Sequence, residues 1–147
     1  MKQPPTDQRN RKNPAEGRQP RAQFAGIRFA KPLDAELFNT TALQAAKDVA
    51  QNNRSNKLSQ LRKFYDELLM WETRVAQRPD RFDEYLPLIR MLNAKVAYAE
   101  GRKLVDAVFV DLMRHTLNEV KNPETLTTCK LFWEAFMGFY KKEAKSE

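Results

Sequence analysis

Residues 80–103 read DRFDEYLPLIRMLNAKVAYAEGRK, and their spacing predicts a helix with three chemically different faces. The first face is apolar, and it consists of Tyr85, Leu88, Ile89, Leu92, Val96 and Ala99. The second face holds only Ala94 and Ala97 beside Arg90, so a neighbouring helix or a polymer backbone could come close to it. The rest of the chain must supply helices that cover the apolar face.

The third face of this helix carries Met91, Lys95, Tyr98 and Arg102, at spacings of four, three and four. Two cations with an aromatic ring between them are suited to a phosphate chain. The alternative is a solvated helix edge, where the long stems of Lys and Arg cover apolar surface. Both interpretations stay open from this stretch alone.

Four more amphipathic segments lie on either side of this helix. They predict helices over residues 34–50, 55–78, 104–120 and 124–142. No segment alternates between apolar and polar residues in the manner of a strand. We therefore predict an all-α protein, a compact five-helix bundle in which residues 32–147 form a single helical domain.

The helix ends have recognisable signals. Ser55 or Asn56 is expected to cap the second helix, and Asp80 the third. Pro87 is expected either to kink the third helix or to mark the start of its straight part. Gly101 is placed to end that helix through a left-handed turn.

The last helix, which Asn122 and Pro123 are expected to begin, has the largest apolar stripe. Its members are Leu126, Cys129, Trp133, Phe136 and Tyr140, with Phe132 and Phe139 alongside. A stripe of this size favours a central core helix over a base-stacking platform. Cys129 is then a small buried hydrophobe. A single cysteine allows no internal disulfide, which fits a reducing cytoplasm.

The positive charge of the chain is concentrated at its beginning. Of a net charge of +7 over 147 residues, six units lie within residues 1–31, which hold eight cations and two anions. With little to bury, this stretch is predicted to be a disordered basic tail, although Phe24, Ile27, Phe29 and Leu33 could dock onto the domain. The charge serves either solubility or nonspecific RNA binding. It suits an acidic partner, nucleic acid before anionic membrane.

The chain shows no signal for a membrane span and few groups for chemistry. There is no apolar run near 18 residues and no hydrophobic segment behind the first Met, which argues against a membrane span or secretory signal. Asp111 and His115 share a helix face, and that spacing can orient an imidazole for acid or base work. No nucleophile or metal-ligand cluster joins them, so we predict no catalytic residue, cofactor or metal. A metal-independent ribonuclease using this pair and a helical DNA-binding regulator remain as alternatives.

Three segments carry a more specific signal. They are SQLRK at 59–63, KVAYAEGR at 95–102 and FWEAFMGFY at 132–140. In their order and separation they resemble the small subunit of the type III-A CRISPR effector, the Csm complex. The likeness extends over about residues 55–142. It implies a non-catalytic helical protein present in several copies, stacked as an inner filament beside the backbone and large subunits, and contacting the crRNA–target RNA duplex without reading bases.

The resemblance also implies site residues. Arg62 and Lys63 match the basic pair of the second helix, and Arg102 matches the Arg after the Gly. Lys95 is added because it lies on the same helix face. The predicted RNA-binding set is Lys57, Arg62, Lys63, Lys95, Tyr98, Arg102 and Lys103. Two features depart from the family pattern, Glu100 before the Gly and Pro87 within the helix. A Lys63–Glu67 ion pair at i, i+4 is the competing explanation for Lys63.

Overall fold

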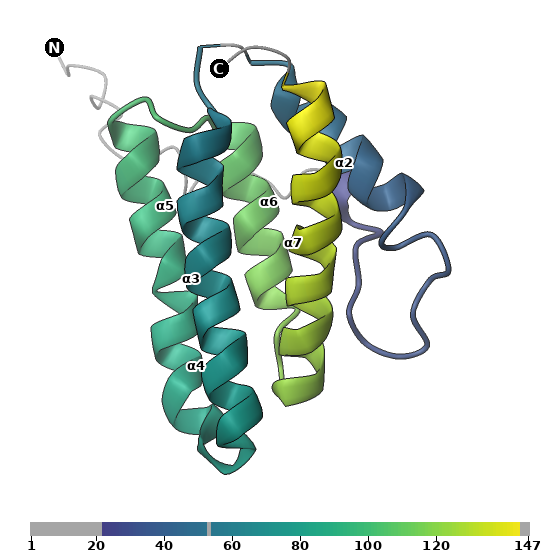
Figure 1. The fold of residues 1–147 in the computed structure, drawn as a ribbon, viewed down its shortest axis with the longest axis vertical. Coiled ribbons are helices and arrows are strands. Elements are labelled where there is room, and N and C mark those ends of the chain that lie inside the picture. Colours follow the sequence, from purple (N-terminus) through teal and green to yellow (C-terminus); the bar gives the residue numbers. More distant parts are fainter. Residues whose placement is uncertain (1–21, 53, 145–147) are drawn as a thin grey trace, which may run out of the picture.

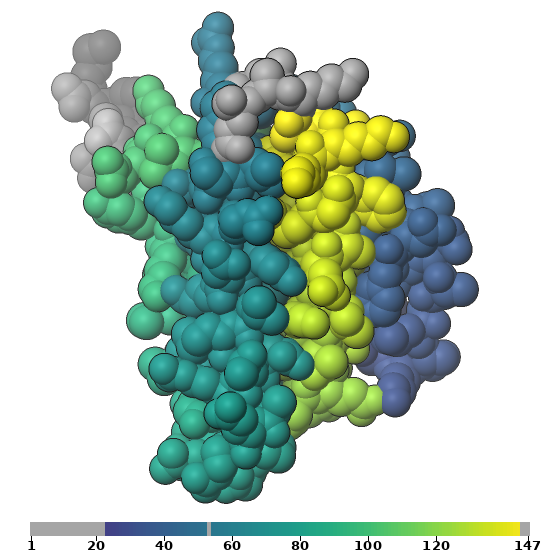
Figure 2. Space-filling model, viewed as in Figure 1, coloured from purple at the N-terminus to yellow at the C-terminus, as the bar shows by residue number. Residues whose placement is uncertain are grey.

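The computed structural model describes residues 22–52 and 54–144, which form a bundle of helices without strands (Figure 1). The elements in chain order are η2 (Ala22–Phe24), α2 (Thr40–Ala50), α3 (Leu58–Gln77), η3 (Pro79–Arg81), α4 (Phe82–Arg90), α5 (Leu92–Gly101), α6 (Ala107–Asn118) and α7 (Pro123–Glu143). One face of the molecule presents α3 between α5 and α7 (Figure 2). The predicted all-α bundle is confirmed. Its third predicted helix corresponds to α4 and α5 together, so that the described residues contain five α-helices when this pair is counted once.

The third helix is interrupted at Met91, one turn beyond Pro87. Proline has no N–H to donate, and its ring crowds the preceding turn, which explains an irregularity near this point. The apolar face predicted for this helix is mostly buried. Leu88 is the exception, since its side chain is 43% exposed. It lies at the margin of the face, in nearly the same direction as Lys95 on the helical wheel.

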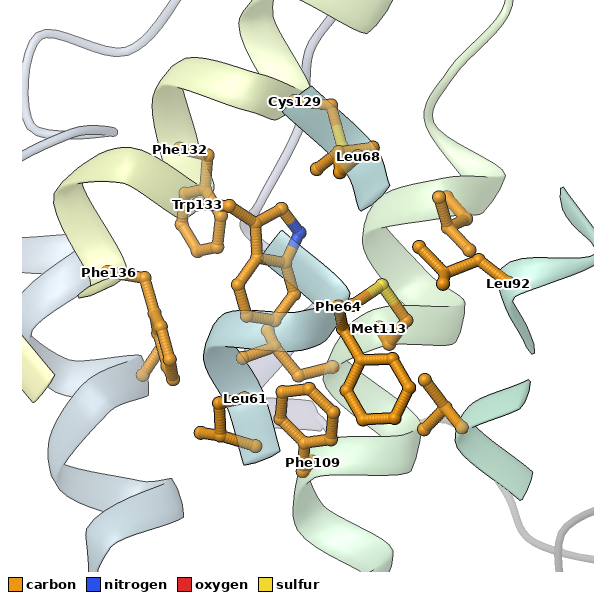
Figure 3. Packing of buried hydrophobic residues seen from close by; sticks show 14 of the residues in the cluster. Leu61, Phe64, Leu68, Leu92, Phe109, Met113, Cys129, Phe132, Trp133 and Phe136 are labelled. Atoms are coloured by element: carbon orange, nitrogen blue, oxygen red, sulfur yellow. The ribbon is translucent and has the colours of Figure 1, made fainter. Parts of the chain in front are cut away.

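α7 is the central helix of the bundle, as its aromatic stripe predicts. It packs against both α2 and α3. Trp133 lies among Phe109, Phe132 and Phe136, with ring centroids 5.7, 5.9 and 4.8 Å away (Figure 3). Cys129 is fully buried, and burial raises the pKa of its thiol, which stays protonated. The prediction that this stripe forms core is confirmed.

Two of the predicted caps are wrong. α3 begins at Leu58, with Lys57 at the N-cap position, so neither Ser55 nor Asn56 caps it. The side chain of Asn56 instead accepts the Asp106 N–H at 2.9 Å. Asp106 lies 50 residues away in the sequence, so the local pattern around Asn56 could not indicate it and suggested a cap instead.

Asp80 also caps no helix. Its carboxylate accepts two hydrogen bonds from the Arg78 guanidinium, at 3.1 and 3.0 Å. These bonds lower the pKa of Asp80. At the beginning of α7, by contrast, the predicted cap is confirmed. Asn122 accepts the Thr125 N–H at 2.8 Å, and the Thr125 hydroxyl oxygen accepts the Asn122 N–H at 3.0 Å.

The first long helix is shorter than predicted. α2 begins at Thr40 rather than near residue 34. The Glu36 carboxylate accepts hydrogen bonds from the side chains of Asn39 and Thr40, at 3.1 and 3.0 Å, and residues 35–39 form turns. Local bonds of this kind compete with the helix and delay its start.

The described part of the predicted tail is packed on the domain. Phe24, Ile27 and Phe29 are buried, as their possible docking suggested. The Phe29 N–H donates to the Glu119 carboxylate at 3.1 Å. The structure thus places residues 22–31, the last part of the predicted basic tail, with the domain, whereas residues 1–21 lie outside the described residues. Within those residues no helix is both long and apolar enough to span a membrane.

Candidate nucleic-acid interface

The N-terminal half of α3 and the C-terminal half of α5 run antiparallel and meet at one end of the bundle (Figure 1). At that end the Asn56 N–H, just before α3, donates to the Leu104 carbonyl, just after α5, at 2.9 Å. Further along, the Lys95 ammonium contacts the Glu67 carboxylate at 2.7 Å and joins the two helices. Residues about 40 positions apart in the chain are thereby brought to one surface.

The face of α5 that was predicted from the spacing of four, three and four points away from the core. Met91, Lys95, Tyr98 and Arg102 are all exposed, and the Tyr98 side chain is 68% exposed. The Arg102 guanidinium carbon lies 5.9 Å from the centroid of the Tyr98 ring, in a cation–π arrangement. Cations and an accessible ring are therefore next to each other on this face.

The basic pair on α3 is divided between two sides of the helix. Lys63 lies one turn before Glu67, on the flank toward α5, and forms no ion pair with any described residue. Glu67 pairs with Lys95 instead, so the predicted Lys63–Glu67 pair is wrong. Arg62 is turned about 100° away, beside Tyr65, whose pKa is raised chiefly by burial and also by the charge of Glu134 on α7.

We use the term "α3–α5 surface" for Lys63, Lys95, Tyr98, Arg102 and Lys103. Of the other predicted contact residues, Arg62 lies on the α7 side of α3. Lys57 is exposed at the N-cap position of α3, at the same end of the bundle. The contacts that define this surface are the Arg102–Tyr98 pair on α5 and the Lys95–Glu67 ion pair between α5 and α3, and Arg62 lies apart from both.

Lys103 has an unusual backbone conformation. Gly101 lies inside α5, and the left-handed residue that ends the helix is Lys103, with φ of 62°. The Leu104 N–H donates to the Ala99 carbonyl and the Lys103 N–H to the Glu100 carbonyl, both at 2.9 Å, which is the Schellman arrangement. The predicted left-handed turn at Gly101 is therefore wrong by two residues, and a lysine occupies the position that usually holds glycine.

The strain at Lys103 leads to a prediction about stability. Lys103→Gly is expected to raise the free energy of unfolding by about 1 kcal/mol, because a left-handed conformation costs a residue with a Cβ atom about that much. Lys103→Ala removes the same charge but keeps the Cβ atom, and should leave the stability nearly unchanged. Urea unfolding of the three proteins measures the difference. Equal stability of the Gly and Ala variants would show that Lys103 is not strained.

A family model described as Csm2 Type III-A matches residues 33–146 of the chain. The chain belongs to the type III-A Csm2 family. It is accordingly a small subunit of the type III-A CRISPR Csm complex, as its resemblance implied. The comparisons with curated proteins and with solved structures give no match.

The geometry around His115 gives no support to the ribonuclease alternative. Its Nε2–H donates to the Ile27 carbonyl at 2.7 Å, so this nitrogen holds the N-terminal segment against α6. Asp111 is buried in the bundle. Within the described residues of this Csm2 family member, no three His, Cys, Asp or Glu side chains gather where they could bind a metal ion.

Glu67 pairs with a different residue from the one its spacing predicts. The i, i+4 rule assigned it to Lys63 on its own helix, whereas its partner Lys95 belongs to α5. Only knowledge of which helices are neighbours could have identified that pair. In this Csm2 family member the Lys95–Glu67 pair places one anion, the Glu67 carboxylate, at the edge of the α3–α5 surface.

Proposed function

We propose that the chain binds RNA within the Csm complex through sequence-independent phosphate contacts of the α3–α5 surface, and that it catalyses no reaction. The RNA would be the crRNA–target RNA duplex. The observation that carries this proposal is the position of Tyr98, which is exposed with Arg102 against its ring, on a helix that the Lys95–Glu67 ion pair joins to α3.

Phosphate contacts are the mode of binding that fits both the residues and the task. A subunit that must accept any target sequence cannot depend on base edges, whereas phosphates are the same in every sequence. Lys63, Arg102 and Lys103 are exposed at the ends of two helices, where their long side chains can reach a backbone. Each contact releases counterions, so the affinity should depend on salt.

The assembly follows from the family. We propose that several copies of the chain stack as an inner filament beside the backbone and large subunits, in the cytoplasm. Family membership supports a place in the complex, and the filament and its partners are part of the proposal. Purification of a tagged copy from its host should recover crRNA and partner proteins. Recovery of the tagged chain by itself would count against assembly.

The RNA contacts can be tested with the double variant Lys63→Ala and Arg102→Ala. We expect RNA binding to weaken by the same factor for unrelated sequences. The slope of log K against log salt should become flatter by about one unit for each lost contact, about two units in all. Fluorescence anisotropy titrations at four or five salt concentrations measure both quantities.

A matched control removes the same charge at the other end of the bundle. Arg81 precedes α4 and Lys121 precedes α7, and both are exposed. Arg81→Ala with Lys121→Ala should leave the salt slope close to that of the unaltered protein. An unchanged slope in the Lys63 and Arg102 variant, or an equal change in both variants, would reject the α3–α5 surface as the contact region.

A further inference from the structure

We infer that Tyr98 stacks on an unpaired base of the bound RNA, so that the α3–α5 surface favours a strand with a free base over a fully paired duplex. This inference rests on the proposed function, because it assigns a role to one residue of the same surface. It differs from phosphate binding in that it concerns the aromatic face of the base. It requires no recognition of base identity, since every base has such a face.

The exposure of Tyr98 is the first observation. Every other aromatic side chain in residues 22–52 and 54–144 is buried or partly buried, whereas Tyr98 is 68% exposed. Its backbone is held in the regular helix α5. A rigid ring presented to solvent is a ready platform for stacking.

The second observation concerns what surrounds the ring. Arg102 lies against it, with the guanidinium carbon 5.9 Å from the centroid. Because the guanidinium lies over one face of a ring that is largely exposed, the inference assigns the base to the opposite face. Such a stack of cation, ring and base would place the strand's phosphates near Arg102 and Lys95. The charges therefore favour an anionic polymer as the occupant rather than an apolar protein surface.

The third step is chemical. In a continuous duplex both faces of each base are covered by their neighbours, so a side chain can stack only on a base that has left the stack. The preference should consequently appear only when the RNA has a single-stranded stretch or an unpaired base. Phosphate contacts by Lys63 and Lys103 are available in either case.

The test uses the full chain and RNA that carries the fluorescent base 2-aminopurine. One probe is a single strand, a second is a perfect duplex, and a third is a duplex with 2-aminopurine as an unpaired bulge. For Tyr98→Leu we expect affinity for the single strand and the bulge to fall about tenfold, with fluorescence quenching lost. Affinity for the perfect duplex should change less than twofold. Tyr98→Phe should retain both the affinity and the quenching.

Two further readouts separate this role from the others. Tyr98→Leu removes no cation, so its salt slope should equal that of the unaltered protein, whereas Lys95→Ala should flatten the slope. Equal losses on all three probes, or no loss on any, would overturn base stacking. If the Lys63 and Arg102 variant still weakens binding in that case, the proposed function stands without this inference. If the unaltered protein binds none of the probes, the proposed function itself fails.

Discussion

Asn56→Ala is expected to lower the free energy of unfolding by about 3–5 kcal/mol, measured by urea unfolding. Asn56 is only 1% exposed and forms hydrogen bonds with three other parts of the chain, at Val49, at residues 104–106 and at Tyr140. Its side chain donates to the Val49 carbonyl at 3.2 Å and accepts the Asp106 N–H at 2.9 Å. Each of these groups would lose its partner, at a cost of about 1–3 kcal/mol.

The backbone at this position adds to the cost. Asn56 has φ of 59°, a left-handed conformation that asparagine tolerates better than alanine does. Its N–H donates to the Leu104 carbonyl, and its carbonyl accepts the Tyr140 hydroxyl, so the conformation is fixed from both sides. These backbone bonds hold the beginning of α3 to the end of α5 and to α7. The same bonds therefore position both halves of the α3–α5 surface.

Asn56→Gly is the comparison that separates the two causes. It removes the same side-chain hydrogen bonds but accepts positive φ, so it should cost about 1 kcal/mol less than Asn56→Ala. Equal losses would assign the whole effect to the hydrogen bonds. A loss below about 1 kcal/mol for both variants would contradict the central position of Asn56.

The helices and their buried faces were predictable from the sequence because both depend on local spacing. The positions of Leu126, Trp133 and Tyr140 repeat at the helical period, and all three are buried. Burial of so much aromatic surface dominates the other contributions to the packing of α7. The exposed face of α5 followed from the same periodicity, through Lys95 and Tyr98.

The sequence could not predict the contacts between elements. Asn56 resembles a helix cap, and only the neighbouring Asp106 and Val49 explain its real role. The boundary of the tail was missed for a similar reason. Composition averages over residues 22–31, whereas Ile27 and Phe29 are held by individual bonds to His115 on α6 and to Glu119 just after it. Such bonds connect positions about 90 residues apart and have no signature in either segment.

Trp133→Ala is expected to lower the free energy of unfolding by about 3–5 kcal/mol, the usual range for removing a buried aromatic side chain. Trp133 is 2% exposed, and its loss would leave a cavity beside Phe109 and Phe136 (Figure 3). Its Nε1–H also donates to the Thr116 hydroxyl oxygen at 3.0 Å, so this buried hydroxyl would lose its donor.

Two comparisons make the Trp133 prediction specific. Trp133→Phe keeps an aromatic ring but removes the N–H. It should lower the free energy of unfolding by only about 1–2 kcal/mol, which measures the bond to Thr116 together with a small cavity. Tyr98→Leu removes an aromatic ring that is exposed, and should change the free energy of unfolding by less than about 0.5 kcal/mol. If the α7 stripe served RNA rather than the core, Trp133→Ala would instead leave unfolding almost unchanged and weaken RNA binding. Because Trp133 is buried, we expect the reverse. Trp133→Ala should lower stability, and Tyr98→Leu should weaken the binding of unpaired RNA.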